Sequence, residues 1–64
     1  MKQYKVSFNK KRNGKLFNSY FTEYPDVNHF ITDLLHLNYE KIYVYEIIEN
    51  KNEYSYKMID QYLF

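Results

Sequence analysis

A single apolar stripe at helical spacing limits this chain to one amphipathic helix. The stripe consists of apolar residues that lie three or four positions apart, Val27, Phe30, Ile31, Leu34 and Leu35. This spacing places them on one face of an α-helix. We predict the helix near residues 26–38, because Asp26 is a suitable N-terminal cap and Asn38 tolerates the left-handed conformation that ends helices.

The residues before the stripe predict a β-hairpin. Apolar and polar side chains alternate over residues 4–9, which is the pattern of a half-buried strand. Asn13-Gly14 is a strong hairpin signal, because both positions of the tight turn need a positive φ. If these two residues form the loop, Val6 lies opposite Phe21 in the return strand.

The residues after the stripe predict a second hairpin. β-Branched and aromatic residues dominate residues 40–49, which favours a strand, and residues 53–59 form the expected return strand. We favour a two-residue turn at Asn50-Lys51 over a three-residue loop, which would switch the pairing of the faces. The two-residue turn keeps four apolar residues on one face, Ile42, Val44, Ile48 and Ile59.

These segments predict a single small domain over residues 1–64, of the α+β class. We expect a four-stranded antiparallel sheet in β-β-α-β-β order with one helix packed on one face, because one helix covers only one side of a sheet. The expected core comprises Val6, Phe8, Phe17, Phe21, Phe30, Ile31, Leu34, Ile42, Val44 and Ile48. The uncovered face is expected to carry Tyr20, Tyr43, Tyr45, Tyr54, Tyr56, Lys5 and Lys11.

The composition excludes several classes of protein. The chain contains no cysteine, so disulfides, thiolate catalysis and cysteine-based zinc sites are absent. No apolar run reaches membrane-spanning length, and the N-terminal residues lack the apolar segment of a signal peptide. We therefore expect a cytoplasmic protein that does not associate with membranes.

The sequence lacks the signatures of an enzyme. Its single glycine is assigned to the first hairpin turn, so a glycine-rich phosphate-binding loop is absent, and no serine has a nucleophile-elbow motif around it. His29, Asp33 and His36 share a polar stripe of the predicted helix, but exposed ligands without supporting partners bind metal weakly. We expect no catalytic residue, no cofactor and no metal site.

Charge is distributed unevenly along the chain. Residues 1–22 hold six basic residues and no acid, whereas residues 23–64 hold all eight acids and three lysines. The basic residues gather at the first hairpin, which suits contacts with phosphates. A nucleic-acid-binding function is therefore the alternative that we carry, with the contacts made by Lys5, Lys10, Lys11, Arg12 and Lys15.

The tyrosines of the uncovered face favour a protein partner. Tyrosine supplies a large contact area at a low cost in side-chain entropy, and it is enriched at the centres of interfaces. Our first hypothesis is a non-enzymatic protein-binding module, a monomer or homodimer, that docks through Tyr20, Tyr43, Tyr45, Tyr54 and Tyr56. The composition is typical of an AT-rich gene, so we also expect a phage or plasmid origin and a role as an inhibitor or modulator of a host protein.

Overall fold

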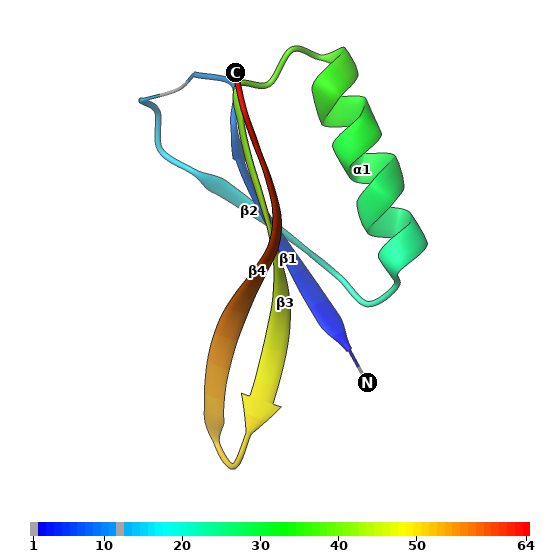
Figure 1. The fold of residues 1–64 in the computed structure, drawn as a ribbon, viewed down its shortest axis with the longest axis vertical. Coiled ribbons are helices and arrows are strands. Elements are labelled where there is room, and N and C mark those ends of the chain that lie inside the picture. Colours follow the sequence, from blue (N-terminus) through cyan, green and yellow to red (C-terminus); the bar gives the residue numbers. More distant parts are fainter. Residues whose placement is uncertain (1, 12) are drawn as a thin grey trace.

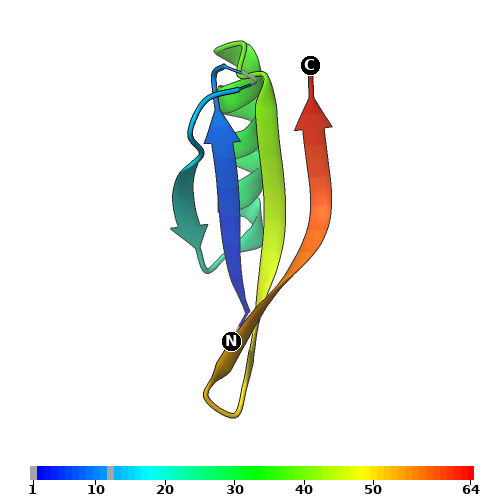
Figure 2. The same ribbon diagram turned by 90° about the vertical axis from the view of Figure 1, so that its left-hand side faces the viewer.

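One antiparallel sheet and one helix make up the structure (Figure 1), a computed structural model that describes residues 2–11 and 13–64. The elements follow one another as β1 (Gln3–Asn9), β2 (Phe17–Phe21), α1 (Tyr24–His36), β3 (Lys41–Asn50) and β4 (Glu53–Leu63). The strand order is β2-β1-β3-β4, and every neighbouring pair is antiparallel. Figure 2 shows that α1 lies along one face of the sheet and leaves the other face open. The predicted α+β fold is confirmed.

Helix α1 begins two residues earlier than the sequence suggested. Glu23, in extended conformation, is the N-terminal cap, although no side-chain hydrogen bond caps the helix there. Pro25 lies inside the first turn, where its missing N–H costs nothing because this position has no intrahelical acceptor. Asp26 is therefore a first-turn residue rather than the cap, and its carboxylate lies near the positive end of the helix dipole.

The end of α1 follows the predicted mechanism. Asn38 adopts a left-handed conformation with φ of 62°. The Asn38 N–H donates to the carbonyl oxygen of Leu35, and the Tyr39 N–H donates to that of Leu34, each over 3.1 Å. This pair of bonds is the Schellman arrangement, which satisfies the last carbonyls of a helix and turns the chain back. The turn directs the chain into β3, beside β1.

The core lies between α1 and the two central strands. The buried cluster comprises Tyr4, Val6, Val27, Ile31, Leu34, Ile42 and Val44. Phe8 extends this cluster towards the end of the helix, with its ring centroid 5.2 Å from that of Phe30 and 5.7 Å from that of Tyr39. Both ring pairs are edge-to-face, the arrangement that aromatic quadrupoles favour.

Two residues that we expected in the core are exposed. Phe17 begins the edge strand β2 and is 61% exposed. Ile48 is 40% exposed, because β1 pairs with β3 only as far as Ile47 and the β3–β4 hairpin projects beyond the helix (Figure 1). Tyr4, which we did not assign to the core, is buried and places its ring 5.4 Å from that of Tyr24.

The β1–β2 hairpin does not have the predicted two-residue loop. Val6 lies opposite Ser19 rather than Phe21, and residues 10–16 connect the strands. Gly14 has no positive φ, so it does not serve the tight turn that we predicted. Its lack of a side chain is needed for a different reason, because a Cβ at this position would lie 2.5 Å from Oδ1 of Asn9.

Asn9 organises the β1–β2 loop from inside. Its buried side chain accepts a hydrogen bond from the Lys11 N–H over 2.6 Å and donates from Nδ2 to the Lys15 carbonyl oxygen. The Gly14 N–H donates to the Lys11 carbonyl oxygen over 3.1 Å. These bonds hold the loop against the end of β1. The register is shifted by two residues, and an even shift leaves every strand residue on its predicted face.

The β3–β4 hairpin turns one residue later than predicted. Lys51 and Asn52 are the central turn residues, with φ of 43° and 70°, the conformation of a tight type I′ hairpin. The strand β4 also continues to Leu63, past the predicted end at residue 59. A bulge leaves Ile59 between the partners of Val44 and Tyr45, so Ile59 does not join the apolar face as we expected.

Candidate functional site: the tyrosine face of the sheet

The open side of the sheet collects aromatic side chains from three strands. On this side the register places Lys5 of β1 between Tyr20 of β2 and Tyr45 of β3. Tyr54 and Tyr56 of β4 lie on the same side, opposite Glu49 and Ile47. We call this surface the tyrosine face, and it comprises Lys5, Tyr20, Lys41, Tyr43, Tyr45, Tyr54 and Tyr56. The two-residue turn thus unites the tyrosines of β3 and β4 as predicted.

Three of the rings form a continuous strip across β3 and β4. The ring centroids of Tyr43 and Tyr45 are 6.4 Å apart, and those of Tyr45 and Tyr56 are 6.2 Å apart. The second pair meets edge-to-face at 73°. Such contacts join the three rings into one aromatic surface that a partner can cover.

Lysine ammonium groups lie over the rings of the strip. Nζ of Lys5 lies 4.2 Å from the ring centroid of Tyr56 and 5.1 Å from that of Tyr45. Nζ of Lys41 lies 5.7 Å from the ring centroid of Tyr43. These are cation–π distances. Lys41 was not among our predicted site residues, although it precedes Tyr43 by two positions and the alternation of a strand places it on the same face.

The outer tyrosines are the most exposed members of the face. Tyr20 on the edge strand β2 is 62% exposed, and Tyr54 near the β3–β4 turn is 63% exposed. Tyr56 is 51% exposed even though it contacts both Lys5 and Tyr45. Fully desolvated tyrosines contribute most of the binding energy in many interfaces, and these three side chains have much surface left to desolvate.

A hydrogen bond between a buried serine and an exposed asparagine connects the two strands at the edge of the tyrosine face. Ser7 is buried in the middle of β1, and its hydroxyl donates to Oδ1 of Asn18 on β2 over 2.6 Å. The two residues are cross-strand partners. This bond uses the Ser7 hydroxyl for structure and fixes β2, and with it Tyr20, to the rest of the sheet.

Basic and acidic residues are distributed unevenly between the two faces of the sheet and along the tyrosine face. Lys5 and Lys41 lie on the tyrosine face, whereas Asp60 and Glu46, which is opposite Lys57, lie on the helix side, where Asp26 and Asp33 of α1 are also exposed. Along the face, Lys41 lies opposite Asn9 at the loop end and Glu49 lies near the other turn. The tyrosine face thus carries a lysine at its centre and at its loop end, and a glutamate at its turn end.

The basic loop adjoins the tyrosine face rather than belonging to it. Lys10, Lys11 and Lys15 are exposed in the connection after β1, so Lys11 does not lie on the sheet face where we expected it. Arg12, the remaining basic residue of the predicted nucleic-acid contact, lies outside the described residues. The three lysines extend the basic end of the face beyond Lys41.

The polar stripe of α1 does not assemble into a metal site. His29, Asp33 and His36 are exposed, and no group of three or more His, Cys, Asp or Glu residues within residues 2–11 and 13–64 is arranged to hold a metal ion. Our expectation that the chain binds no metal stays a prediction.

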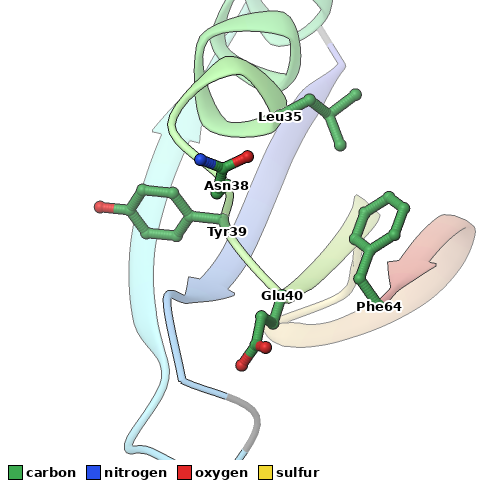
Figure 3. A pocket seen from close by; sticks show the side chains of 5 residues that line it. All are labelled: Leu35, Asn38, Tyr39, Glu40 and Phe64. Carbon is green, nitrogen blue, oxygen red and sulfur yellow. The ribbon is translucent and has the colours of Figure 1, made fainter.

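A groove lies at the C-terminal end of α1. The groove has a volume of about 420 Å³ and is lined by Leu35, Asn38, Tyr39, Glu40 and Phe64 (Figure 3). The Phe64 N–H donates to the Glu40 carbonyl oxygen over 2.9 Å, which ties the last residue of the chain to the start of β3. The groove lies beside the C-terminal end of α1 and is separate from the strip of tyrosine rings.

One tyrosine on the helix side has a perturbed ionisation. Tyr62 lies opposite Ile42, and its hydroxyl donates to Oδ2 of Asp60 over 2.9 Å. The hydrogen bond to Asp60, followed by burial and the negative charge of that carboxylate, raises the pKa of Tyr62 above 10.0. This tyrosine therefore stays protonated and belongs to the structure of the sheet, not to the tyrosine face.

Comparisons with family models, curated proteins and solved structures find no match for this chain. Among the described residues, no helix is long and apolar enough to span a membrane, α1 having 13 residues.

Proposed function

We propose that this protein is a small protein-binding module that docks through the tyrosine face. The observation that carries the proposal is a continuous aromatic strip on the side of the sheet that the helix leaves open. Leaving so much contiguous aromatic surface in water is unfavourable for a monomer, and surfaces of this kind mark interaction sites. Tyr20, Tyr54 and Tyr56 supply the exposed area, while Tyr43 and Tyr45 hold the strip together.

The contacts of the lysines favour a protein partner over single-stranded nucleic acid. A base that stacks on tyrosine needs a free ring face, and an ammonium group already lies over the rings of Tyr43, Tyr45 and Tyr56. A stacked base would have to displace these lysines. A protein partner instead packs against the ring edges and hydroxyl groups and leaves the cation–π contacts in place.

The proposal is tested by affinity capture from a lysate of the source organism. Tyr54→Ala and Tyr56→Ala should each weaken capture of a partner about tenfold, because buried interface tyrosines contribute at the level of hot spots. Leu37→Ala is the matched control, since Leu37 is an exposed apolar residue at the C-terminal cap of α1, away from the tyrosine face. Capture that survives nuclease treatment and is lost only in the tyrosine variants supports the proposal. Unchanged capture by both tyrosine variants contradicts it.

The exposed lysines of the β1–β2 loop favour a second candidate, binding to nucleic acid. Lys10, Lys11 and Lys15 lie in the connection that follows Asn9, the cross-strand partner of Lys41. If each loop lysine neutralises a phosphate, the affinity for duplex DNA falls with salt at a logarithmic slope of about −3. Replacing all three with Gln should nearly flatten that slope. Binding that needs the loop lysines but not the tyrosines would support this alternative.

The protein-binding proposal includes a phage or plasmid origin of the gene. The amino-acid composition is typical of an AT-rich gene, which suits a phage or plasmid origin. A binding module encoded by a phage or plasmid would meet a host protein as its partner. Identification of the captured protein as a host enzyme or regulator, with its activity changed by the wild type but not by Tyr56→Ala, would support a role as an inhibitor or modulator.

A further inference from the structure

Two ammonium groups lie within the aromatic strip of the tyrosine face. Lys5 spans the rings of Tyr45 and Tyr56, and Lys41 lies over the ring of Tyr43 at the other end of the strip. A cation held over a ring is partly desolvated and still lacks a full counter-charge, so an anion is favoured beside it. The strip therefore combines apolar contact area with two fixed positions for negatively charged groups.

The acids of the four strands lie away from these positions. Glu46 and Asp60 are on the helix side of the sheet, and Glu49 is at the turn end of the tyrosine face. Of the strand residues described on this face, the basic ones are therefore at its centre and loop end, and the acidic one is at its far end. Charge complementarity requires a partner that is acidic over the strip and neutral or basic beyond it.

We infer that the tyrosine face recognises an acidic polypeptide segment, whose carboxylates pair with Lys5 and Lys41 while its apolar side chains pack on the rings between them. This inference rests on the proposed function and adds the chemistry of the partner. A nucleic acid fits less well, because its charge is uniform and the strand would run into Glu49 at the turn end. A polypeptide carries carboxylates only where the lysines are.

The test uses three short synthetic peptides with identical apolar residues and with Glu, Gln or Lys at every polar position. Their binding to the full chain is measured by fluorescence anisotropy, with oligothymidylate of equal length as the nucleic-acid probe. The Glu peptide should bind about tenfold more tightly than the Gln peptide, since each exposed ion pair contributes up to about fivefold. High salt should remove most of that difference.

Charge variants locate the effect on the tyrosine face. Lys5→Gln and Lys41→Gln should each weaken binding of the Glu peptide about threefold and leave binding of the Gln peptide unchanged. Lys57→Gln is the matched control, because Lys57 is exposed on the helix side of the same sheet and its removal changes the net charge equally. Lys5→Arg should retain the affinity. If Lys5→Gln fails to fold, Lys41→Gln at the first residue of β3 tests the same claim.

Three outcomes would overturn the inference: equal binding of the Glu and Gln peptides, tighter binding of oligothymidylate than of the Glu peptide, or equal losses in Lys57→Gln and Lys5→Gln. These outcomes are separate from a failure of the proposed function. If Tyr56→Ala loses the captured partner while the Glu and Gln peptides bind alike, the face binds a protein of different chemistry. If Tyr56→Ala and Tyr54→Ala both keep the partner, the face itself is wrongly assigned.

Discussion

In the β1–β2 hairpin, the strands lie under the helix and a loop is held by the buried side chain of Asn9, whereas the β3–β4 hairpin closes in a tight turn and projects beyond the helix (Figure 1). The first hairpin contains Asn-Gly, the strongest local signal for a tight turn, and does not use it. The second contains Lys51-Asn52, a weaker signal, and does adopt the tight turn. Where a loop packs against the core, its tertiary contacts decide the turn.

The covered part and the projecting part of the sheet also have different roles. The covered part of the sheet supplies the hydrophobic core, through β1 and the first half of β3. The projecting part supplies Tyr54 and Tyr56 and leaves its side chains exposed. A region with few buried contacts opens more readily than the core. The binding surface that we propose therefore extends from a rigid base onto a less stable hairpin end.

The largest expected effect is a difference in stability between the covered part and the projecting part of β3. Ile42→Ala should lower the free energy of unfolding by about 2–5 kcal/mol, because Ile42 is fully buried under α1. Ile48 lies on the same face of β3 but beyond the helix, so Ile48→Ala should lower the free energy of unfolding by about 1 kcal/mol or less. Urea denaturation measures both values. Equal losses would mean that the projecting end is packed as well as the core.

The next effect concerns the contact between Gly14 and Asn9. Gly14→Ala should destabilise the protein by about 1–3 kcal/mol, because the new methyl group would overlap the Asn9 side chain. Asn9→Ala should also cost about 1–3 kcal/mol, since it removes hydrogen bonds to the loop. The double variant should be less destabilised than the sum of the two, because the overlap is gone. Additive losses would show that the two residues act independently.

The tight turn of the β3–β4 hairpin offers a smaller, stabilising change. Replacing Lys51-Asn52 with Asn-Gly should raise the free energy of unfolding by about 0.5 kcal/mol, because both positions have a positive φ that these residues favour. Asn50→Gly, at the adjacent strand position, is the control and should destabilise instead. Hydrogen exchange of the amides near the turn measures the local effect. No change in that exchange would mean that the turn does not limit opening of the hairpin end.

The faces of the sheet were predictable from the sequence, and the loops were not. A strand alternates its side chains, so the tyrosines of β3 and β4 share a face as long as any register shift is even. Both hairpins differ from the prediction by such a shift. The role of Asn9 depends on contacts with Gly14 and Lys15, which no local pattern encodes. The bulge at Ile59 likewise could not be predicted from the sequence, because it does not interrupt any run of apolar residues.

The candidate site was predictable to the same extent. Alternation together with the choice of a two-residue turn groups Tyr43, Tyr45, Tyr54 and Tyr56. Alternation applied to Lys41 would have added the second cation of the strip. The cation–π contacts of Lys5 require the distances between neighbouring strands, which depend on the register of β4. The position of Lys11 was wrong because the predicted tight turn would have extended β1 past Asn9.

The smallest expected effect is a pH dependence on the helix side of the second hairpin. The pKa of Tyr62 is raised in the folded protein by its hydrogen bond to Asp60, by burial and by the Asp60 charge, so the folded state holds this proton more tightly than the unfolded state. The stability that Tyr62 contributes is therefore fully present below pH 10.0, its unfolded value, and is lost as the pH rises through the raised folded value.

Tyr62→Phe removes the contribution, so the difference in unfolding free energy between wild type and variant should shrink as the pH rises above 10.0. In an Asp60→Asn background much of that pH dependence should disappear, because Asp60 supplies both the acceptor and the charge. A difference between wild type and Tyr62→Phe that stays constant into alkaline solution would mean that Tyr62 and Asp60, which lie on the same strand β4, are not coupled in the folded protein.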